Sequence, residues 1–274
     1  RRITLAAKAI QPKSGKMALG SRPPVTCTTQ TKMPPAIAEV IEIQGRSEQG
    51  AQKPFLCRAD DGQTYYVKGR QTDRSSLCNE WICAHLAVQL GLPLPPFKLL
   101  HVSQELLDEA PRPWRELGCG IAFGSQRHPG CTWFDKAQIL HVPQDLQANI
   151  LAFDWWVQNV DRMDGNSNLL WDAHRSALVV IDHNLAFDPH LDAATFIENH
   201  IFRGCWQKTD LVSRDRLQDQ LSEAMDAVFR FACDNIPPEW HWNNPECDIP
   251  ARVDINAIAA TLAKCKSPDF WRFT

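Results

Sequence analysis

The sequence has no apolar run long enough to cross a bilayer as a helix, and one of its more apolar stretches, 151–157, is interrupted by Asp154. It also has no two cysteines in the C-x-x-C spacing typical of zinc sites, although it contains 10 cysteines. Its formal net charge of −3 gives no general attraction to nucleic acid or to anionic membranes. We therefore expect a cytoplasmic protein with reduced, mostly buried thiols that binds neither membrane nor nucleic acid directly.

Acidic residues are absent from the first 36 positions, which carry seven basic residues. This segment also lacks the long apolar stretch of a secretory signal. A basic start without acids is typical of a transit peptide or of a flexible tail. We predict a flexible basic N-terminal tail over residues 1–36.

The chain as a whole has the composition of a folded globular protein. Its 274 residues are 44% hydrophobic and 22% charged, which allows one large domain or two of ordinary size. The 10 tryptophans are many for this length, and most are expected to pack in the core.

Strand signals dominate the first half of the chain. Short apolar or β-branched segments are bounded by turn residues, and the Asp-Asp-Gly at 60–62 is typical of a hairpin turn. A helix is expected to be capped by Ser75 or Ser76 and to continue through the apolar periodicity of 81–90 until Gly91. The predicted strands lie at 37–43, 54–58, 64–68, 97–102 and 119–123.

Helical periodicity dominates the second half. One pair of strands is expected at 169–171 and 177–181, with a turn between them. This order predicts an α+β protein in which residues 37–122 form a small antiparallel β-sheet with one helix and residues 123–274 form a mostly helical unit. The predicted helices lie at 144–157, 193–201, 210–235 and 254–263.

The polar loop at 159–168 carries the strongest chemical signal. Asp161 and Asn166 stand in the spacing D-x-x-x-x-N, and Asp182 follows at the end of the apolar run 178–181. In phosphoryl transfer, one aspartate accepts the proton of the attacking hydroxyl, while an amide and a second carboxylate hold magnesium. The residue types and their order therefore predict a kinase-type catalytic loop.

The same residues could instead belong to a solvated loop, where Asp and Asn make turns and cap helices. A D-x-x-x-x-N match alone is weak. The context favours the catalytic interpretation, because the loop follows a predicted helix and precedes the strands that deliver Asp182. Asp164 is interpreted as a loop residue with no required part in the transfer.

Three further residues fit a nucleotide site. Lys68 ends a predicted strand, where a phosphate-binding lysine is expected. Glu80 lies on the next helix and can pair with Lys68. An acid in the first turn of a helix can instead serve only to interact favourably with the helix dipole. Gly50 lies in the polar turn between the first two predicted strands, at the place of a loop that covers phosphates.

Six short segments stand in a fixed order along the chain. Together they resemble the motifs of the HipA-like kinases, and more narrowly those of the stand-alone HipA family kinases, over about residues 37–235. The catalytic loop is also similar to that of phosphoinositide 3- and 4-kinases, which share the broad kinase fold. The segments are Gly50-Ala51-Gln52-Lys53, Tyr66-Val67-Lys68, Asn79-Glu80, Asn159-Val160-Asp161-Arg162, Asn166-Ser167-Asn168-Leu169-Leu170 and Ile181-Asp182-His183.

The resemblance implies a two-lobe protein-kinase-like fold and an ATP- and Mg²⁺-dependent serine/threonine protein kinase that can autophosphorylate. It implies that Asp161 is the catalytic base and that Glu80 supports Lys68. It further implies that Asn166 and Asp182 bind Mg²⁺. The nucleotide-binding residues that it implies are Lys68, Gly50, Gln52 and the hinge backbone at Ala122, Phe123 and Gly124.

Regulation is expected from the resemblance alone. In the toxin members of the family a serine of the phosphate loop can be autophosphorylated, and Ser47 stands in the matching place, three residues before Gly50. Those members carry a further domain ahead of the kinase core, where this chain has a short tail. A toxin role and an antitoxin or other regulatory partner are therefore left open. Asp182 is followed by His183-Asn184 instead of Phe-Gly, so activation-loop arguments from eukaryotic protein kinases do not transfer.

Other functions stay open beside the protein kinase, whose protein substrate the sequence does not name. A lipid or small-molecule kinase on the same fold is one, although no basic membrane-facing helix is evident. A nucleotide-binding pseudokinase regulator is another, although the lysine, the base and both metal ligands are present. A tryptophan-rich interaction module is the third. His183, His190 and His200 do not share one helix face and are interpreted as ordinary polar or core histidines.

Overall fold

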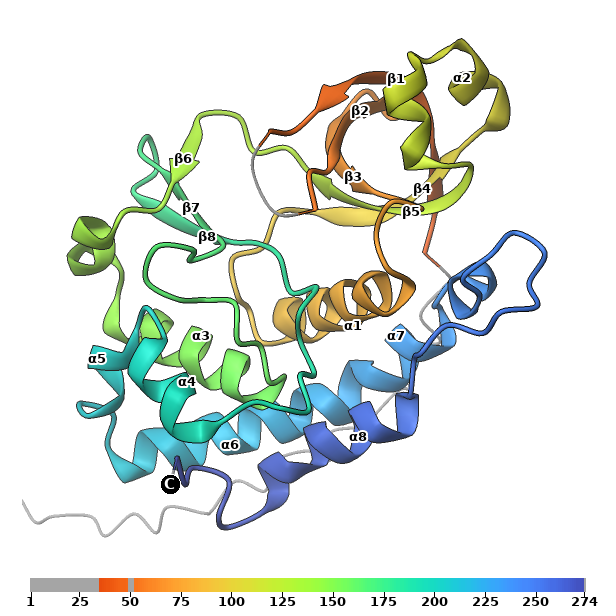
Figure 1. Ribbon diagram of the computed structural model, residues 1–274. Coiled ribbons are helices and arrows are strands. Elements are labelled where there is room, and N and C mark those ends of the chain that lie inside the picture. The colour runs from red at the N-terminus through yellow and green to blue at the C-terminus, as the bar shows by residue number, and fades with distance from the viewer. Residues whose placement is uncertain (1–34, 49–51, 274) are drawn as a thin grey trace, which may run out of the picture. The chain divides into compact units, whose positions relative to one another are not determined.

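The computed structural model describes residues 35–48 and 52–273 (Figure 1). The chain divides into two units, residues 1–33 and 34–274, and the second of these is described below. Nearly all of the predicted tail, together with Gly50, lies outside the described residues.

Five strands form a closed barrel in the order β1-β2-β3-β5-β4. The barrel closes because β1 pairs antiparallel with β2 and parallel with β4. Two register shifts in the β1–β2 ladder mark bulges, and bulges let one strand bend from one neighbour to another. The sequence predicted an antiparallel sheet and missed both the closure and the parallel contact. The strands are β1 (Ile37–Arg46), β2 (Phe55–Ala59), β3 (Thr64–Lys68), β4 (Phe97–Val102) and β5 (Gly120–Gln126).

The barrel has its own apolar interior. Side chains alternate between buried and exposed along β2 and β3, as expected where one face of a strand packs in a core. Phe55, Tyr65, Val67 and Leu100 are among the buried residues that fill it. The hairpin turn between β2 and β3 forms as predicted, with Gly62 at φ +79°.

Helix α1 (Arg74–Gln89) packs against β5, against the π-helical turn Met225–Phe229 and against helix α7 (Arg230–Asp234) (Figure 1). It begins two or three residues earlier than its predicted caps: Asp73 is the N-cap, and its carboxylate accepts the backbone N–H groups of Ser75 and Ser76. Its side chains are buried on most sides, and the indole of Trp81 donates to the carbonyl of Ala232 at 2.9 Å. The helix is therefore an internal element, which explains why its apolar residues extend beyond one face.

The second half of the chain is mostly helical, as predicted. The predicted helix at 210–235 is continuous but contains one π-helical turn, Met225–Phe229, between α6 and α7. The helices are α3 (Gln144–Trp156), α4 (Ala193–Asn199), α5 (Arg203–Trp206), α6 (Leu211–Ala224), α7 (Arg230–Asp234) and α8 (Ile255–Ala263).

A small antiparallel sheet has the strand order β6-β7-β8. In the sequence, β6 precedes α3, whereas β7 and β8 lie between α3 and the later helices. The sequence predicted β7 (Leu169–Asp172) and β8 (Ala177–Val180) but missed β6 (Cys131–Trp133). It also missed helix α2 (Gln104–Glu109) and the 3₁₀ turns, whose few residues carry little periodicity. Those turns are Arg112–Leu117, Lys136–His141, Pro238–His241 and Lys264–Lys266.

The boundary expected between residues 122 and 123 falls inside β5. Residues 123–126 still pair with β3 and β4, so the change from barrel to helical unit comes after Gln126. Trp240 ties the C-terminal part to this strand, because its indole donates to the carbonyl of Ile121 at 2.8 Å.

Tryptophans anchor the larger core, as predicted: Trp81, Trp156 and Trp240 are fully buried. Within the described part of the chain, none of the helices combines the length and the apolar character needed to span a membrane.

Candidate active site

Lys68, Glu80 and Asp182 meet in one ion-paired cluster. The Nζ of Lys68 lies 2.8 Å from Glu80 Oε2 and 2.8 Å from Asp182 Oδ1. Lys68 is the last residue of β3, Glu80 lies in α1, and Asp182 follows β8. The structure thus brings together three residues that the sequence placed in one site.

A close approach between two backbones ends β3 directly after Lys68. The N–H of Arg70 donates to the carbonyl of Leu117 at 2.7 Å. A Cβ on Gly69 would lie 2.4 Å from that same carbonyl oxygen, so only glycine fits there. The turn therefore fixes where the strand ends and where the Lys68 side chain starts.

The three charges of this cluster are largely buried. Burial acts to lower the pKa of Lys68, but the charges of Glu80 and Asp182 outweigh it and the pKa is raised. Burial raises the pKa of Glu80 in spite of Lys68. For Asp182, burial is outweighed by the charge and hydrogen bond of Lys68, and its pKa is lowered. At neutral pH the lysine and Asp182 are therefore charged, and the cluster has more acids than bases, which suits the approach of a cation.

The backbone of Asp182 adopts a left-handed conformation, with φ +59°. This region is uncommon for residues other than glycine. The N–H of Asn184 donates to the Asp182 carboxylate at 3.4 Å. The chain thus turns sharply after β8 and directs the carboxylate toward Lys68.

Two asparagines of the polar loop hold Asp161. The side-chain amide of Asn166 donates to Asp161 Oδ1 at 2.7 Å, and that of Asn168 donates to Asp161 Oδ2 at 2.8 Å. Asn168 also donates to the backbone carbonyl of Asp161. The donor role of Asn166 leaves its amide oxygen available to a cation. The sequence did not assign a role to Asn168, although its repetition two residues after Asn166 was a usable signal.

Burial raises the pKa of Asp161, and the negative charge of Asp182 adds to this, against the lowering effect of the two amides. A raised carboxylate pKa strengthens Asp161 as a proton acceptor, while two fixed hydrogen bonds keep its orientation.

A buried ion pair stabilises the polar loop at 159–168. The carboxylate of Asp154 on α3 accepts from Arg162 Nε at 2.6 Å, and both side chains are fully buried. Arg162 Nη1 donates to the carbonyls of Ser167, Asn168 and Ile181. One guanidinium therefore links the polar loop at 159–168 to the residue that precedes Asp182. The sequence gave Asp154 and Arg162 no such role, although an acid within an apolar helical run was a signal.

Two buried histidines complete this support. His183 Nε2 lies 3.0 Å from Arg162 Nη2, which makes that nitrogen an acceptor, and burial lowers the pKa of His183 to about 3. His200 Nδ1 accepts the N–H of Phe202, so its Nε2 donates to Asp154 at 3.1 Å. Burial also lowers the pKa of His200. Both rings are core groups, as interpreted from the sequence, whereas His190 is exposed.

A cavity of about 400 Å³ opens beside Lys68 and Asp182. This volume is within the usual range for sites that bind small molecules. Its wall combines the polar groups of Lys68, Glu80, Asn168 and Asp182 with apolar ones. The apolar wall includes Pro95, Phe123, Leu170 and Ile181. Asp161 is not among the wall residues, and it reaches the site through Asn168.

The predicted hinge residues lie within β5. This strand pairs with β4 along most of its length and with β3 over residues 123–126, so Phe123 and Gly124 have a paired strand on both sides, whereas Ala122 is paired with β4 alone. The side chain of Phe123 lines the cavity, as do Gln126 at the end of β5 and His128 and Cys131 in the segment that follows. The predicted contact of the hinge backbone with adenine stays a prediction.

The predicted phosphate loop is described only in part. Gly50 lies outside the described residues. Ser47 and Pro54 flank the turn, line the cavity and are joined by a backbone hydrogen bond of 2.8 Å. Gln52 is described, and its buried Oε1 finds no hydrogen-bond partner among the residues that the structure covers. The predicted nucleotide contacts of Gln52 and Gly50 stay predictions.

The chain belongs to the HipA-like kinase family, whose family model matches residues 40–274. The match extends beyond the region of resemblance found in the sequence and includes the last helix. Members of this family are phosphotransferases by their description. No curated protein matches the chain.

Solved structures with similar folds are distant. The proinflammatory kinase CtkA of Helicobacter pylori is 11% identical, with a TM-score of 0.46, over 85% of this chain and 95% of that one. The Golgi casein kinase with Mn/ADP bound is 13% identical, with a TM-score of 0.40, over 85% of this chain and 72% of that one. The family match, and not these similarities, identifies the class of the protein.

Proposed function

We propose that the protein is an ATP- and Mg²⁺-dependent kinase that transfers the γ-phosphate to a serine or threonine hydroxyl of a protein. The observation that carries the proposal is the Lys68–Glu80–Asp182 cluster at the wall of a nucleotide-sized cavity. Family membership supports the same conclusion.

Each residue of the cluster has a task in this proposal. Lys68 binds the phosphates, and Glu80 holds the ammonium group in place. The carboxylate of Asp182 and the amide oxygen of Asn166 are the hard oxygen ligands that Mg²⁺ prefers, so the donor set fits this ion. Bound Mg²⁺ would neutralise charge on the phosphate oxygens. The barrel with α1 serves as the N-lobe, the helical unit as the C-lobe, and the apolar wall near Phe123 and Leu170 receives the base.

Asp161 orients the acceptor hydroxyl and takes its proton. Its two amide donors fix the carboxylate, and burial raises its pKa, so a proton is accepted more readily than by an exposed aspartate. Positioning and charge neutralisation account for most of the catalysis in phosphoryl transfer, and this arrangement supplies both. Ser47 remains a candidate for autophosphorylation because it lines the same cavity.

The experiment is phosphate transfer from labelled ATP by Asp161→Asn. We expect the rate to fall by about 10²- to 10⁴-fold, the usual contribution of a general base. Binding of Mg-ATP, measured as a rise in melting temperature, should persist because the cluster is intact. Asp164→Asn is the matched control in the same loop, since Asp164 is exposed and paired with Lys136, and it should keep full activity.

Equal activity of Asp161→Asn and the parent protein would show that the base is misassigned. Mg-ATP binding without transfer to any acceptor, including the protein itself, would favour a pseudokinase regulator. Protein, lipid and small-molecule acceptors should be offered side by side, and transfer to a lipid or small molecule alone would overturn the proposed acceptor class.

A further inference from the structure

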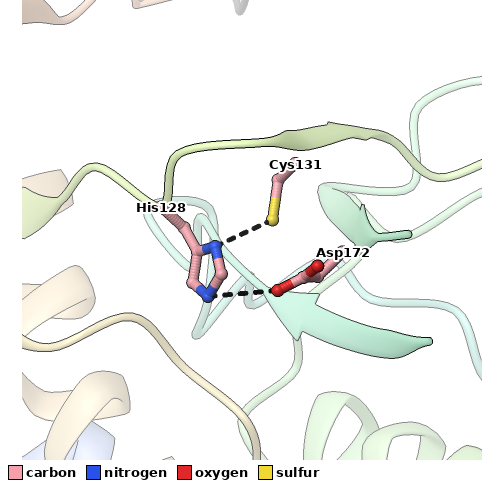
Figure 2. Close-up of side chains that lie close together, drawn as sticks. All are labelled: His128, Cys131 and Asp172. Carbon is pink, nitrogen blue, oxygen red and sulfur yellow. Dashed lines mark hydrogen bonds and ion pairs between the residues drawn. The ribbon is translucent and has the colours of Figure 1, made fainter. Parts of the chain in front are cut away.

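A histidine, a cysteine and an aspartate meet beside the cavity (Figure 2). His128 Nδ1 lies 3.2 Å from Cys131 Sγ, and His128 Nε2 lies 3.7 Å from Asp172 Oδ2. One atom from each residue can be chosen such that all three lie within 4.8 Å of one another. Among residues 35–48 and 52–273, this is the one group of three or more His, Cys, Asp and Glu side chains with such an arrangement.

The fold fixes the positions of these three side chains. Cys131 on β6 and Asp172 on β7 are direct cross-strand partners, so their side chains project from neighbouring points of one sheet. His128 stands three residues before Cys131, and Gly130 between them has φ +83°, which turns the chain and brings the imidazole back toward the thiol. The three groups thus converge without any change in the backbone.

Asp172 is prepared for a further partner. Its Oδ1 accepts the backbone N–H groups of His174 and Arg175, at 3.0 and 3.1 Å, and is thereby held in the β7–β8 turn. Its Oδ2 faces His128, as Figure 2 shows. A carboxylate fixed through one oxygen presents the other in a defined direction, which is how supporting hydrogen bonds orient metal ligands.

We propose that His128, Cys131 and Asp172 form a binding site for one Zn²⁺ ion. Imidazole nitrogen, thiolate sulfur and carboxylate oxygen are zinc ligands, and one ring nitrogen of His128 would serve. Two ligands of a tetrahedral zinc are about 3.5 Å apart, so three atoms that lie within 4.8 Å of one another need only small side-chain movements to surround one ion. Mg²⁺ prefers oxygen donors and binds thiolates poorly, so this site is chemically distinct from the one at Asp182 and Asn166. As the Zn–S bond forms, the thiol proton passes to solvent.

The fourth ligand of a tetrahedral ion would be water. The positive charge of Arg175 opposes a cation here: its Nη1 lies 3.3 Å from His128 Nε2 and 3.8 Å from Asp172 Oδ2. Its side chain is 73% exposed, so it can move into solvent when an ion binds.

The site would join two walls of the cavity. His128 and Cys131 belong to the segment that leaves the barrel, whereas Asp172 ends the strand that carries Leu170. Zn²⁺ would fix His128, in the segment between β5 and β6, to the β6–β8 sheet and so hold the edge of the cavity. An effect on nucleotide affinity rests on the proposed kinase function, whereas metal binding itself does not.

The test is a titration of the full chain with Zn²⁺ after treatment with a chelator, in excess Mg²⁺, followed by calorimetry. We expect one ion per chain, and at least tenfold weaker binding for Cys131→Ser and for Asp172→Asn. Co²⁺ in place of Zn²⁺ should give a sulfur-to-metal charge-transfer band that Cys131→Ser removes. The exposed Cys247 supplies the matched control, because Cys247→Ser should keep both the affinity and the band.

Asparagine at position 172 keeps the oxygen that accepts the turn N–H groups, so this variant should fold, and its melting temperature without metal verifies that. The proposal is overturned if the parent chain shows no saturable Zn²⁺ binding, or if both variants bind as tightly as the parent. Zn²⁺ binding should be unchanged in Asp161→Asn. The Zn²⁺ titration can therefore be interpreted even if the kinase proposal fails.

Discussion

The ammonium group of Lys68 is held by two carboxylates from distant parts of the chain, 12 and 114 residues away. Glu80 and Asp182 repel each other, and Lys68 is what allows both to stand in one buried place. With Mg-ATP bound as proposed, the metal and Lys68 would together offset the repulsion between the two carboxylates. Removal of the lysine therefore affects both the empty and the loaded site.

We predict that Lys68→Met lowers kcat/KM for ATP by at least about 100-fold, because phosphate binding and charge balance are lost together. It should also lower the free energy of unfolding by about 3 kcal/mol or more, since one partner of a buried ion pair is removed. Steady-state kinetics and urea unfolding measure the two effects. Lys98→Met is the control: Lys98 pairs with Asp61 on the barrel, away from the cavity wall, and its loss should leave kcat/KM within about twofold.

The residues of this cluster could be predicted from sequence because each stands at a recognisable place, such as a strand end or a loop motif. The partners of Asn168, Asp154 and Arg162 could not be predicted, since the fold supplies them. His200 reaches Asp154 across 46 residues, and Arg162 reaches Ile181 across 19. Spacing along the chain does not reveal which buried polar groups will satisfy one another.

At the scale of elements, helix α1 determines where Glu80 stands. Its first turn is held by Asp73, which accepts the N–H groups of Ser75 and Ser76 at 3.0 and 3.4 Å. The serines that the sequence suggested as caps are instead the first donors. Loss of this cap would fray the first turn of α1, which connects Lys68 to the helix that carries Glu80.

We predict that Asp73→Ala lowers the free energy of unfolding by about 1 kcal/mol, the usual value of an N-cap. Asp73→Asn should cost only a few tenths of that amount, because asparagine caps helices about as well. Urea unfolding at neutral pH compares the two variants with the parent. Equal losses for alanine and asparagine would show that charge, and not capping, is what Asp73 contributes.

Elements were easier to predict than their contacts. The strands of the barrel and the long helices have clear periodicity, so their places follow from sequence. Closure of the barrel depends on β1 pairing with β4, which lies about 60 residues later, and a local pattern carries no information about such a partner. The same limit applies to the predicted end of the fifth strand near Ala122 to Gly124, because β5 continues to Gln126 and pairs there with two other strands.

At the scale of the molecule, Asp154, Arg162, His183 and His200 form one buried cluster of side chains. It joins α3, the polar loop at 159–168, the end of β8 and the segment after α4. Its two histidines are buried and neutral. In the unfolded chain a histidine titrates near its ordinary pKa of about 6.5, whereas in the folded protein burial and then the charge of Arg162 lower the pKa of His183 to about 3, against Asp154, whose charge acts to raise it. The unfolded state thus binds protons first as pH falls.

The stability contributed by His183 is therefore complete above about pH 6.5 and is lost progressively as pH falls toward 3. We predict that one such histidine removes about 2 kcal/mol from the free energy of unfolding between pH 7 and pH 5. His200 adds a loss in the same direction, because its pKa is lowered too. Urea unfolding at pH 7, 6 and 5 measures the sum.

Replacement of His183 separates its share from the rest. His183→Gln keeps an acceptor for Arg162 but has no proton to gain, so its unfolding free energy should fall less between pH 7 and pH 5, by about 2 kcal/mol, than that of the parent. His190→Gln is the matched control, because the exposed His190 should leave the pH dependence unchanged. If the parent and His183→Gln lose stability equally on acidification, His183 is protonated in the folded protein, and its contact with Arg162 must be different from the one described above.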